Sequence, residues 1–312
     1  MIEKMDVRAR AGIDIYGTVL RYAEVEQRGP QYQLLRLGSC DFDFDIAEAV
    51  LQGSPPEHLE ALTEALNDVF EGSVATRLHV TLHPPTCYSF FTALPVEVAK
   101  EQRKKRLLRE AALLTRSSSP QPLRLTADPV YTETMDDGEA VEWFHVLALN
   151  ERLHARFDRI CRMLPPSRHR MTLSMHAVAK AVERIERRGG EGEGRQQAPF
   201  TLALGWYPTH VEFTLCRHTH WYFSHYTEAA PPADCTYFAL ALTGRLGLEQ
   251  SAIGRIFVYG GFKKADDFAD LAEVFPAVPE PLNPMQLIDL DPDSMAASFD
   301  HAAYAPCLGV AL

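Results

Sequence analysis

The chain has no closely spaced pair of cysteines. Its 312 residues contain six, far apart in the sequence, at positions 40, 87, 161, 216, 235 and 307. A small secreted domain held together by disulfides is therefore excluded, because such domains are short and dense in cysteine. We expect six reduced thiols, most of them packed in the core.

Long apolar runs are absent too. No stretch approaches the roughly 18 consecutive apolar residues of a transmembrane helix. Residues 1–10 are charged and lack the apolar centre of a signal peptide. The sequence therefore predicts a cytoplasmic protein without a membrane segment of its own.

Basic residues are fewer than acidic ones. The chain has 31 Lys and Arg against 42 Asp and Glu, a net charge of −11, which argues against nucleic acid as the main partner. The basic run at 100–109 is mixed with glutamates, so we interpret it as a solvated helix face or, second, as a partner-binding face. With 46% hydrophobic and 23% charged residues, the composition is that of a globular protein with a core.

Familiar catalytic motifs are missing. There is no Walker A loop, no GxGxxG opening a helix and no GxSxG elbow, and no residue pair indicates acid–base chemistry. Several metal-binding residue types do crowd one region: His210, Cys216, His218, His220 and His225. We expect no metal site there, because alternate residues of a hairpin with its tip at 217–219 face opposite sides.

Alternating and helical patterns predict the elements of the first half. A meander of three strands is expected at 11–16, 19–27 and 31–37, followed by a helix at 57–71 and a strand at 77–82. Further on, the expected elements are a helix opened by Pro95 and ending near Leu114, two strands, and two helices capped by Asn150 and Ser174. The two strands span 128–135 and 141–149, and the two helices end near 164 and 188.

A glycine-rich stretch without apolar side chains, 189–197, predicts a linker. After it a second meander is expected at 200–204, 211–216 and 220–226. The remaining elements are a helix at 234–247, a strand at 256–259, a helix at 264–275 and a final helix or turn at 300–312. The repeated order of meander and helices indicates an internal duplication.

Four segments resemble motifs of the actin-like ATPase superfamily, most closely the PilM-like type IV pilus assembly proteins of the FtsA and PilM branch. Residues 12–25 (GIDIYGTVLRYAEV) resemble the opening phosphate motif, and 88–95 (YSFFTALP) resemble the start of the subdomain peculiar to this branch. Residues 256–261 (IFVYGG) resemble the adenosine motif, and 303–312 (AYAPCLGVAL) the closing helix. The order and spacing of the four segments extend over nearly the whole chain.

The resemblance implies an α/β fold of the actin-like (ribonuclease H-like) type, with duplicated βββαβα lobes and an inserted small α+β subdomain. The first lobe would be 1–188, with the insertion at about 87–148 and the C-terminal segment 296–312 returning to it. After the linker, the second lobe would be 198–295, with the further subdomain of the relatives reduced or absent.

The chain departs from the family pattern where the resemblance places the nucleotide phosphates. In the first motif Asp14 is kept, but Tyr16 stands where the family has glycine, and Gly17 follows one residue late, before Thr18. Glycine in that turn lets backbone amides approach the phosphates.

The second phosphate motif and the adenosine motif also depart. Gly205 stands where the family has an acid that holds a magnesium-bound water, and Tyr207 where it has glycine. Gly260-Gly261 is kept but is followed by Phe262 instead of a small residue. Phosphoryl transfer needs a metal-holding carboxylate and close backbone approach, so we predict that hydrolysis is lost.

We hypothesise that Tyr16, Tyr207 and Phe262 converge on the cleft and partly fill it, so that the lobes are held closed by packing. The alternative is that these aromatic side chains point into the core elsewhere. We therefore expect no catalytic residues, no cofactor and no metal.

The function implied by the resemblance is assembly. The chain would be a cytoplasmic scaffold of a type IV pilus or type II secretion-like platform, held at the inner membrane by the cytoplasmic N-terminal tail of a bitopic, PilN-like protein. Other platform proteins would be further partners. The docking groove carried over from the family lies between the first lobe and the inserted subdomain, near Phe90, Phe91 and Leu94.

Two alternatives from other classes stay open. The first is an active ATPase or sugar kinase-like phosphotransferase that binds ATP and magnesium through Asp14, Thr18 and Gly260-Gly261. The second is a nucleotide-sensing filament former related to FtsA. ATP turnover would support the first, and nucleotide binding without turnover the second.

Overall fold

A computed structural model describes most of the chain, namely residues 8–29, 31–53, 55–84, 86–115, 123–189, 199–289 and 299–312. The expected linker at 189–197 lies outside these ranges except for Gly189. Within them, every helix is too short or too polar to span a bilayer.

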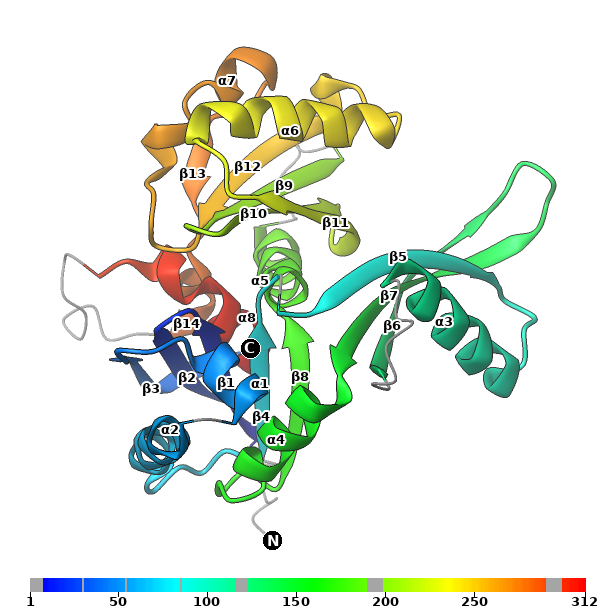
Figure 1. Cartoon of the computed structure of the whole chain (residues 1–312). Coiled ribbons are helices and arrows are strands. Elements are labelled where there is room, and N and C mark those ends of the chain that lie inside the picture. The colour runs from blue at the N-terminus through cyan, green and yellow to red at the C-terminus, as the bar shows by residue number, and fades with distance from the viewer. Residues whose placement is uncertain are drawn as a thin grey trace, which may run out of the picture.

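The first meander forms one side of a six-stranded sheet (Figure 1). Antiparallel β1–β2–β3 is extended by β4, parallel to β1, and by β8, parallel to β4, while β14 adds to the free edge of β3. The bounds are β1 Arg8–Tyr16, β2 Val19–Arg28, β3 Gln31–Asp41, β4 Arg77–Leu82, β8 Arg168–Leu173 and β14 Ile288–Asp289. The predicted meander is confirmed, and β8 and β14 were not predicted.

The second meander builds a five-stranded sheet with the same plan. Its order is β11-β10-β9-β12-β13, again an antiparallel meander followed by two parallel strands. The bounds are β9 Phe200–Trp206, β10 His210–Arg217, β11 His220–Glu228, β12 Ile253–Tyr259 and β13 Pro279–Pro281. Because the order β3-β2-β1-β4-β8 recurs as β11-β10-β9-β12-β13, the internal duplication read from the sequence is confirmed.

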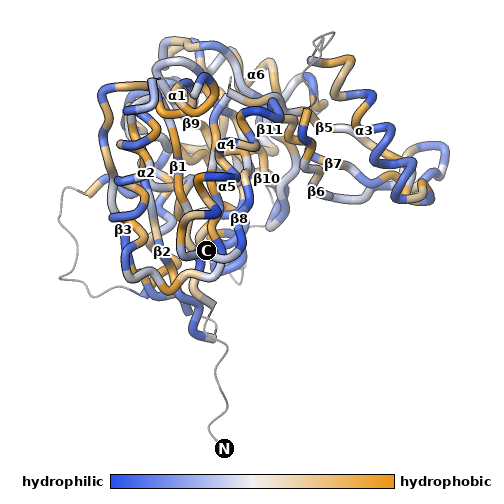
Figure 2. The backbone as a smooth tube through the Cα atoms, turned by 60° about the horizontal axis from the view of Figure 1, so that its bottom comes forward, coloured by the Kyte–Doolittle hydropathy of each residue, from blue (hydrophilic) through white to orange (hydrophobic). Residues whose placement is uncertain are grey.

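A three-stranded sheet, β5-β7-β6, carries one helix, α3, and projects from the side of the molecule (Figure 1). Its bounds are β5 Tyr88–Pro95, α3 Lys100–Leu114, β6 Leu123–Thr134 and β7 Ala140–Asn150. The expectation that Pro95 opens the helix is wrong. Pro95 is the last residue of β5, where its missing N–H costs no ladder bond, and the helix begins five residues later. Hydrophilic residues dominate α3 in Figure 2, as a solvated face requires.

The remaining helices cover the sheets. They are α1 Ile46–Gln52, α2 Pro56–Phe70, α4 Glu151–Cys161, α5 Ser174–Gly189, α6 Pro232–Arg245, α7 Leu271–Val274 and α8 Ala305–Ala311. Short 3₁₀ turns are η1 Gln250–Ala252, η2 Ala265–Phe268, η3 Pro284–Leu287 and η5 His301–Tyr304. Helix α1 was missed, and the single helix expected at 264–275 is wrong. Most hydrogen bonds there run to the third residue back, so the segment is a 3₁₀ turn followed by the four-residue α7.

Helices α5 and α8 join the two sheets, and two glycines make that possible. A Cβ on Gly12 of β1 would lie 2.0 Å from the carbonyl oxygen of Cys307 in α8, and one on Gly309 would lie 2.1 Å from that of Ala177 in α5. The backbones therefore approach more closely than side chains allow. Buried residues of both sheets and both helices form one continuous cluster, which includes Ala23 of β2 and Ala203 of β9.

Gly309→Ala should lower the free energy of unfolding by about 1–3 kcal/mol, because the added methyl group meets backbone and not a flexible side chain. The matched control is Gly244→Ala in α6, where an added Cβ has no atom within 4 Å and φ is not positive. That variant should be neutral or slightly more stable. Urea unfolding of both variants is the measurement, and equal effects would contradict the close packing of α8.

Candidate functional site

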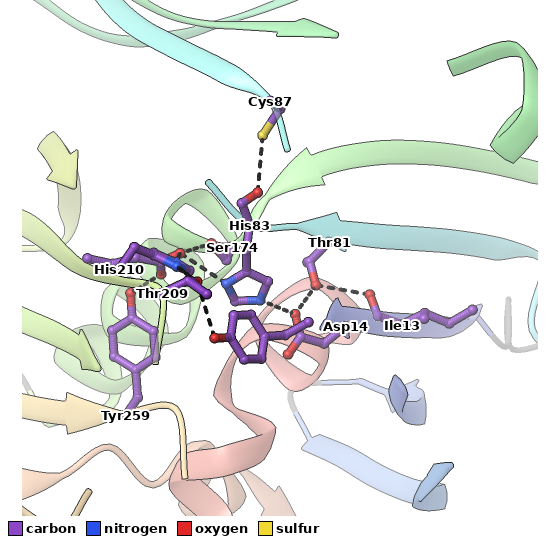
Figure 3. Close-up of polar contacts among 11 residues, drawn as sticks. Ile13, Asp14, Thr81, His83, Cys87, Ser174, Thr209, His210 and Tyr259 are labelled. Carbon is purple, nitrogen blue, oxygen red and sulfur yellow. Dashed lines mark hydrogen bonds and ion pairs between the residues drawn. The ribbon is translucent and has the colours of Figure 1, made fainter. Parts of the chain in front are cut away.

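Buried polar side chains from five segments meet where the two sheets face each other (Figure 3). Asp14 lies on β1, His83 directly follows β4, Ser174 begins α5, and Glu212 and Tyr259 lie on β10 and β12. The parallel pairing of β1 and β4 sets Asp14 beside Thr81, whose hydroxyl contacts both the carbonyl oxygen of Ile13 and Asp14 Oδ1. Asp14, His83 and Glu212 are 1%, 3% and 0% exposed, so water does not screen their charges.

His83 bridges two carboxylates of different sheets. Its Nε2 lies 2.8 Å from Asp14 Oδ1, and its Nδ1 lies 3.1 Å from Glu212 Oε1. Both ring nitrogens donate only in the charged imidazolium, so this arrangement selects the protonated form. We call Asp14, His83 and Glu212 the charged clasp, since it ties β1 and the end of β4 to β10.

The pKa values follow this geometry. Burial by itself lowers the pKa of His83, but the carboxylates of Asp14 and Glu212 outweigh it and raise this pKa to about 9. For Glu212, burial favours the neutral acid, yet the charge of His83 and the hydrogen bonds from His210 and His83 hold its pKa far below the usual range. At neutral pH His83 is therefore protonated and Glu212 is ionised.

Glu212 also receives hydrogen bonds from neutral groups. Tyr259 donates its hydroxyl to Oε2 at 2.6 Å, Ser174 donates to Oε1, and His210 Nε2 lies 3.1 Å from Oε1. Burial lowers the pKa of His210, although Glu212 partly opposes this, so His210 is neutral. A buried carboxylate with this many donors is well stabilised in its charged form.

A chain of hydroxyl groups connects His210 to the first sheet. With its proton on Nε2, His210 accepts at Nδ1 from Thr209 Oγ1, 3.0 Å away. Thr209 Oγ1 in turn lies 3.2 Å from the hydroxyl of Tyr16, at the end of β1. The turn between β9 and β10 is thus linked to β1 by a second polar contact beside the clasp.

The rings of Tyr16 and Tyr207 pack on His83 of the clasp, and exposed Phe262 packs on these two rings. The centroid of Tyr16 is 4.7 Å from that of Tyr207 and 5.4 Å from that of Phe262, and the latter two are 5.8 Å apart. Tyr207 is fully buried and packs on His83 at 4.6 Å and on His210 at 4.8 Å. The side chains that we hypothesised to converge are therefore in mutual contact at the interface between the sheets.

Tertiary packing explains why three positions, 205, 260 and 261, are glycine. A Cβ on Gly205 would lie 2.4 Å from the Tyr259 ring, so the space of a side chain at 205 is filled by the tyrosine that donates to Glu212. Gly261, with φ 78°, packs on Ala303 in η5, just before α8. Gly260 has φ 112° and donates its N–H to the carbonyl oxygen of Ala302. The contacts of Gly260 and Gly261 hold the second sheet against the C-terminal segment.

The turn after β1 is a two-residue hairpin. Gly17, with φ 53°, and exposed Thr18 form it, and their carbonyl oxygens accept from Ile46 and Phe42. The preceding side chain, Tyr16, is the one that enters the interface. Gly17 therefore serves the hairpin, as its position at the first central residue requires.

These residues do not fit a magnesium-bound nucleotide. Asp14 Oδ1 contacts His83 and Thr81, position 205, where the resemblance places a second metal-holding acid, is glycine, and the rings of Tyr16 and Tyr207 lie over the clasp. A phosphoryl-transfer site needs free carboxylates and open backbone amides at this place.

A divalent cation is a separate possibility at the same place. His83, His210 and Glu212 offer ligand atoms that all lie within 4.8 Å of one another, a group of the kind that zinc accepts. The observed contacts favour hydrogen bonding, because both nitrogens of His83 face carboxylates and Ser174 already donates to Glu212 Oε1. The expectation that the residues around 210–225 hold no metal concerned a different set and did not include His83 or Glu212.

The residues expected to bind a partner are distributed over one strand, β5. Leu94 is 5% exposed and packs in the small core beneath α3, with half-buried Phe90 at its edge. Phe91 packs on the second sheet instead, with its ring 4.7 Å from Phe223 and 5.2 Å from Trp221. Docking at these residues stays a prediction.

Sequence reasoning missed the clasp residues His83 and Glu212. The signal for Glu212 was a single acid inside the otherwise uncharged run Val211–Cys216. His83 directly follows a strand that pairs with β1, but nothing local indicates that it meets a residue from β10. The pairing depends on how the two sheets face each other.

The three sheets and their connections define an α/β protein with the actin-like ATPase fold. In particular, the chain is similar to PilM as found in a "PilM-PilN type IV pilus biogenesis complex", with a TM-score of 0.68 and 14% identity over 97% of both chains. It is also similar to a protein of unknown function with an actin-like ATPase fold from Bacteroides thetaiotaomicron, with a TM-score of 0.52 and 13% identity over 92% of this chain and 98% of that one. The fold class and the likeness to PilM predicted from the sequence are confirmed.

Comparisons at the level of sequence found no relative. No protein-family model and no curated protein matches the chain. At 14% and 13% identity the property shared with the solved structures is the fold.

Proposed function

We propose that the chain is a non-hydrolysing scaffold of a type IV pilus or type II secretion-like platform, which works on the cytoplasmic side of the inner membrane. The observation that supports this proposal is the closed interface, in which the clasp and the rings of Tyr16 and Tyr207 pack together where the resemblance would place the phosphates. In such a protein the two lobes are held together by packing and buried charge, so that a rigid shape is available without nucleotide.

The partner we propose is the cytoplasmic tail of a bitopic, PilN-like protein. PilM, the similar protein, was solved in a complex with PilN. Among the described strands, β5 pairs only with β7, so its other edge offers unpaired backbone groups to an extended tail. Tyr88, half exposed, and Phe90 would contact the side chains of that tail.

Mg-ATP should leave the melting temperature of the purified protein unchanged at millimolar concentration, and phosphate release should stay at the level of the buffer. A ligand present at about a hundred times its dissociation constant adds about 2.7 kcal/mol, a shift of several degrees. Such a shift without turnover would support the nucleotide sensor instead, and turnover abolished by Asp14→Ala would support the ATPase.

A peptide with the sequence of the N-terminal tail of a PilN-like protein from the same genome should bind the chain, and Phe90→Ala should weaken this binding at least tenfold. Truncating one anchoring aromatic residue commonly costs an interface that much. The matched control is Leu113→Ala on α3, where the side chain is 70% exposed. Equal affinities of both variants, measured by fluorescence anisotropy, would contradict docking at β5.

A further inference from the structure

A cavity of about 300 Å³ lies at the other end of β1, between the first sheet and α5. Five cationic side chains line it: Arg10, Arg77, Lys180, Arg184 and Arg187. Among the described residues one acid, Glu183, lines it as well. Since the chain as a whole carries a net charge of −11, this concentration of positive charge is unusual for the molecule.

The sheet brings arginines together by register. Arg10 on β1 pairs with Arg77 on β4, which pairs with Arg168 on β8, and His79 and Arg170 form the next rung on the same face. Like charges directly opposite each other on neighbouring strands destabilise a sheet. The side-by-side pair Arg77 and Arg168 therefore costs stability unless an anion compensates it.

Helix α5 adds three more cations from above. Lys180, Arg184 and Arg187 are spaced by four and three residues, so they lie on one face of the helix. Like charges at this spacing also cost a few tenths of a kcal/mol per pair. The strands and the helix thus direct positive charge into the same cavity although both would be more stable without it.

Neighbouring acids neutralise only part of this charge, since Asp128 pairs with Arg170, and Asp128 and Glu183 both act to raise the pKa of Lys180. Within the described ranges no carboxylate lies in salt-bridge distance of Arg77, Lys180, Arg184 or Arg187. Glu183 is engaged elsewhere, because its carboxylate accepts the backbone N–H of Trp221 at 2.7 Å. Arg10 donates to the carbonyl oxygen of Leu312 at 3.0 Å.

The pKa values of two side chains that line the cavity are consistent with an excess of positive charge there. Burial and then the cations Lys180 and Arg170 lower the pKa of His79 to about 4, so His79 is neutral, and its buried Nδ1 has no hydrogen-bond partner. Burial and Arg170 likewise lower the pKa of Lys180. A positive potential of this kind is what an anionic ligand would relieve.

We propose that this cavity binds a phosphate-bearing small anion. Guanidinium groups on different elements match the tetrahedral oxygens of a phosphate through paired N–H donors, and Lys180 adds a point charge. The cavity has the size of a small-ligand site and not of a groove for a nucleic-acid strand. The ligand is either a free phosphate compound or the headgroup of an anionic lipid.

The test uses inorganic pyrophosphate as the soluble probe, with isothermal titration at fixed ionic strength. The cavity variant is Arg77→Gln with Arg184→Gln. The control variant, Lys104→Gln with Arg109→Gln, makes the same change in charge on the exposed face of α3. We expect the cavity variant to bind at least tenfold more weakly and the control to bind as the wild type does. Without ligand the cavity variant should melt no lower than the wild type, because it relieves repulsion.

Vesicles distinguish the two sources of phosphate. The vesicle probe is cosedimentation with vesicles of phosphatidylglycerol and phosphatidylcholine. If pyrophosphate does not bind, but the wild type and the control variant cosediment and the cavity variant does not, the ligand is a lipid headgroup. Binding of pyrophosphate without vesicle binding would assign a soluble compound. If neither probe binds, or if both variants bind equally, the proposal is overturned. The proposed scaffold function does not depend on this result.

Discussion

Glu212→Gln should lower the free energy of unfolding by about 3–5 kcal/mol. The substitution keeps the shape of the side chain but removes the charge opposite His83, and leaves a buried imidazolium with Asp14 as its remaining anion. Removing one partner of a buried ion pair costs this much because the other charge stays desolvated. The hydroxyl of Tyr259, which donates to Glu212 Oε2, loses its charged acceptor as well. Urea unfolding at pH 7 is the measurement.

Glu228→Gln is the matched control, since Glu228 ends the neighbouring strand β11 and is exposed. It should change the unfolding free energy by no more than about 0.5 kcal/mol. If Glu212→Gln were as mild as the control, the buried charges would not hold the two sheets together. The closed interface would then lose its energetic basis, and with it the argument for a scaffold that is rigid without nucleotide.

Stability should fall as the pH rises from about 6.5 to 9. The pKa of His83 is raised from 6.5 in the unfolded chain to about 9 in the folded protein. The unfolded state therefore loses this proton first, so the stabilisation is complete below pH 6.5 and is lost as the pH approaches 9. The size of the effect is on the order of 3 kcal/mol. The titratable groups that face His83 are Asp14, Glu212, His210, Tyr207 and Tyr16.

His83→Gln should abolish most of this slope, whereas wild type and Glu228→Gln should share it. Urea unfolding at several pH values between 6.5 and 9 measures it. Below pH 5 a second loss is expected, because the pKa of Glu212 is depressed and protonation of its carboxylate favours unfolding. Stability that depends on added zinc and is lost in EDTA would contradict the charged clasp, and would show that His83, His210 and Glu212 bind a metal ion.

Local sequence patterns were sufficient to predict the elements that bury one face at a regular spacing. The meander β1–β2–β3 alternates, and α2 and α5 carry apolar side chains at helical spacing, so their positions were predictable within a few residues. The predictions failed at Pro95 and at 264–275, where strand pairing and 3₁₀ hydrogen bonding decided the outcome. Helix α1, of seven residues, was too short for its periodicity to be recognised.

Some residues of the site were also recognised from the sequence, and others were missed. Tyr16, Gly205 and Tyr207 were noticed because they depart from a known pattern, and the reason for Gly205 emerged only from the ring of Tyr259 against it. His83 was overlooked because its two partners are 69 and 129 residues away in the sequence. No period or spacing encodes such a contact.

The sequence alone determined the duplicated α/β plan and the likeness to PilM. It also showed where the chain has other residues than the resembled family at the phosphate motifs. Each of these features depends on the order of residues within single segments of the chain. The tertiary structure decided that the interface is closed, that its charges are paired as Asp14–His83–Glu212, and that cations of β1, β4 and α5 share one cavity. Those features arise where segments distant in the chain are packed together. Burial then sets the strength of each charge interaction, because it removes the water that would screen it.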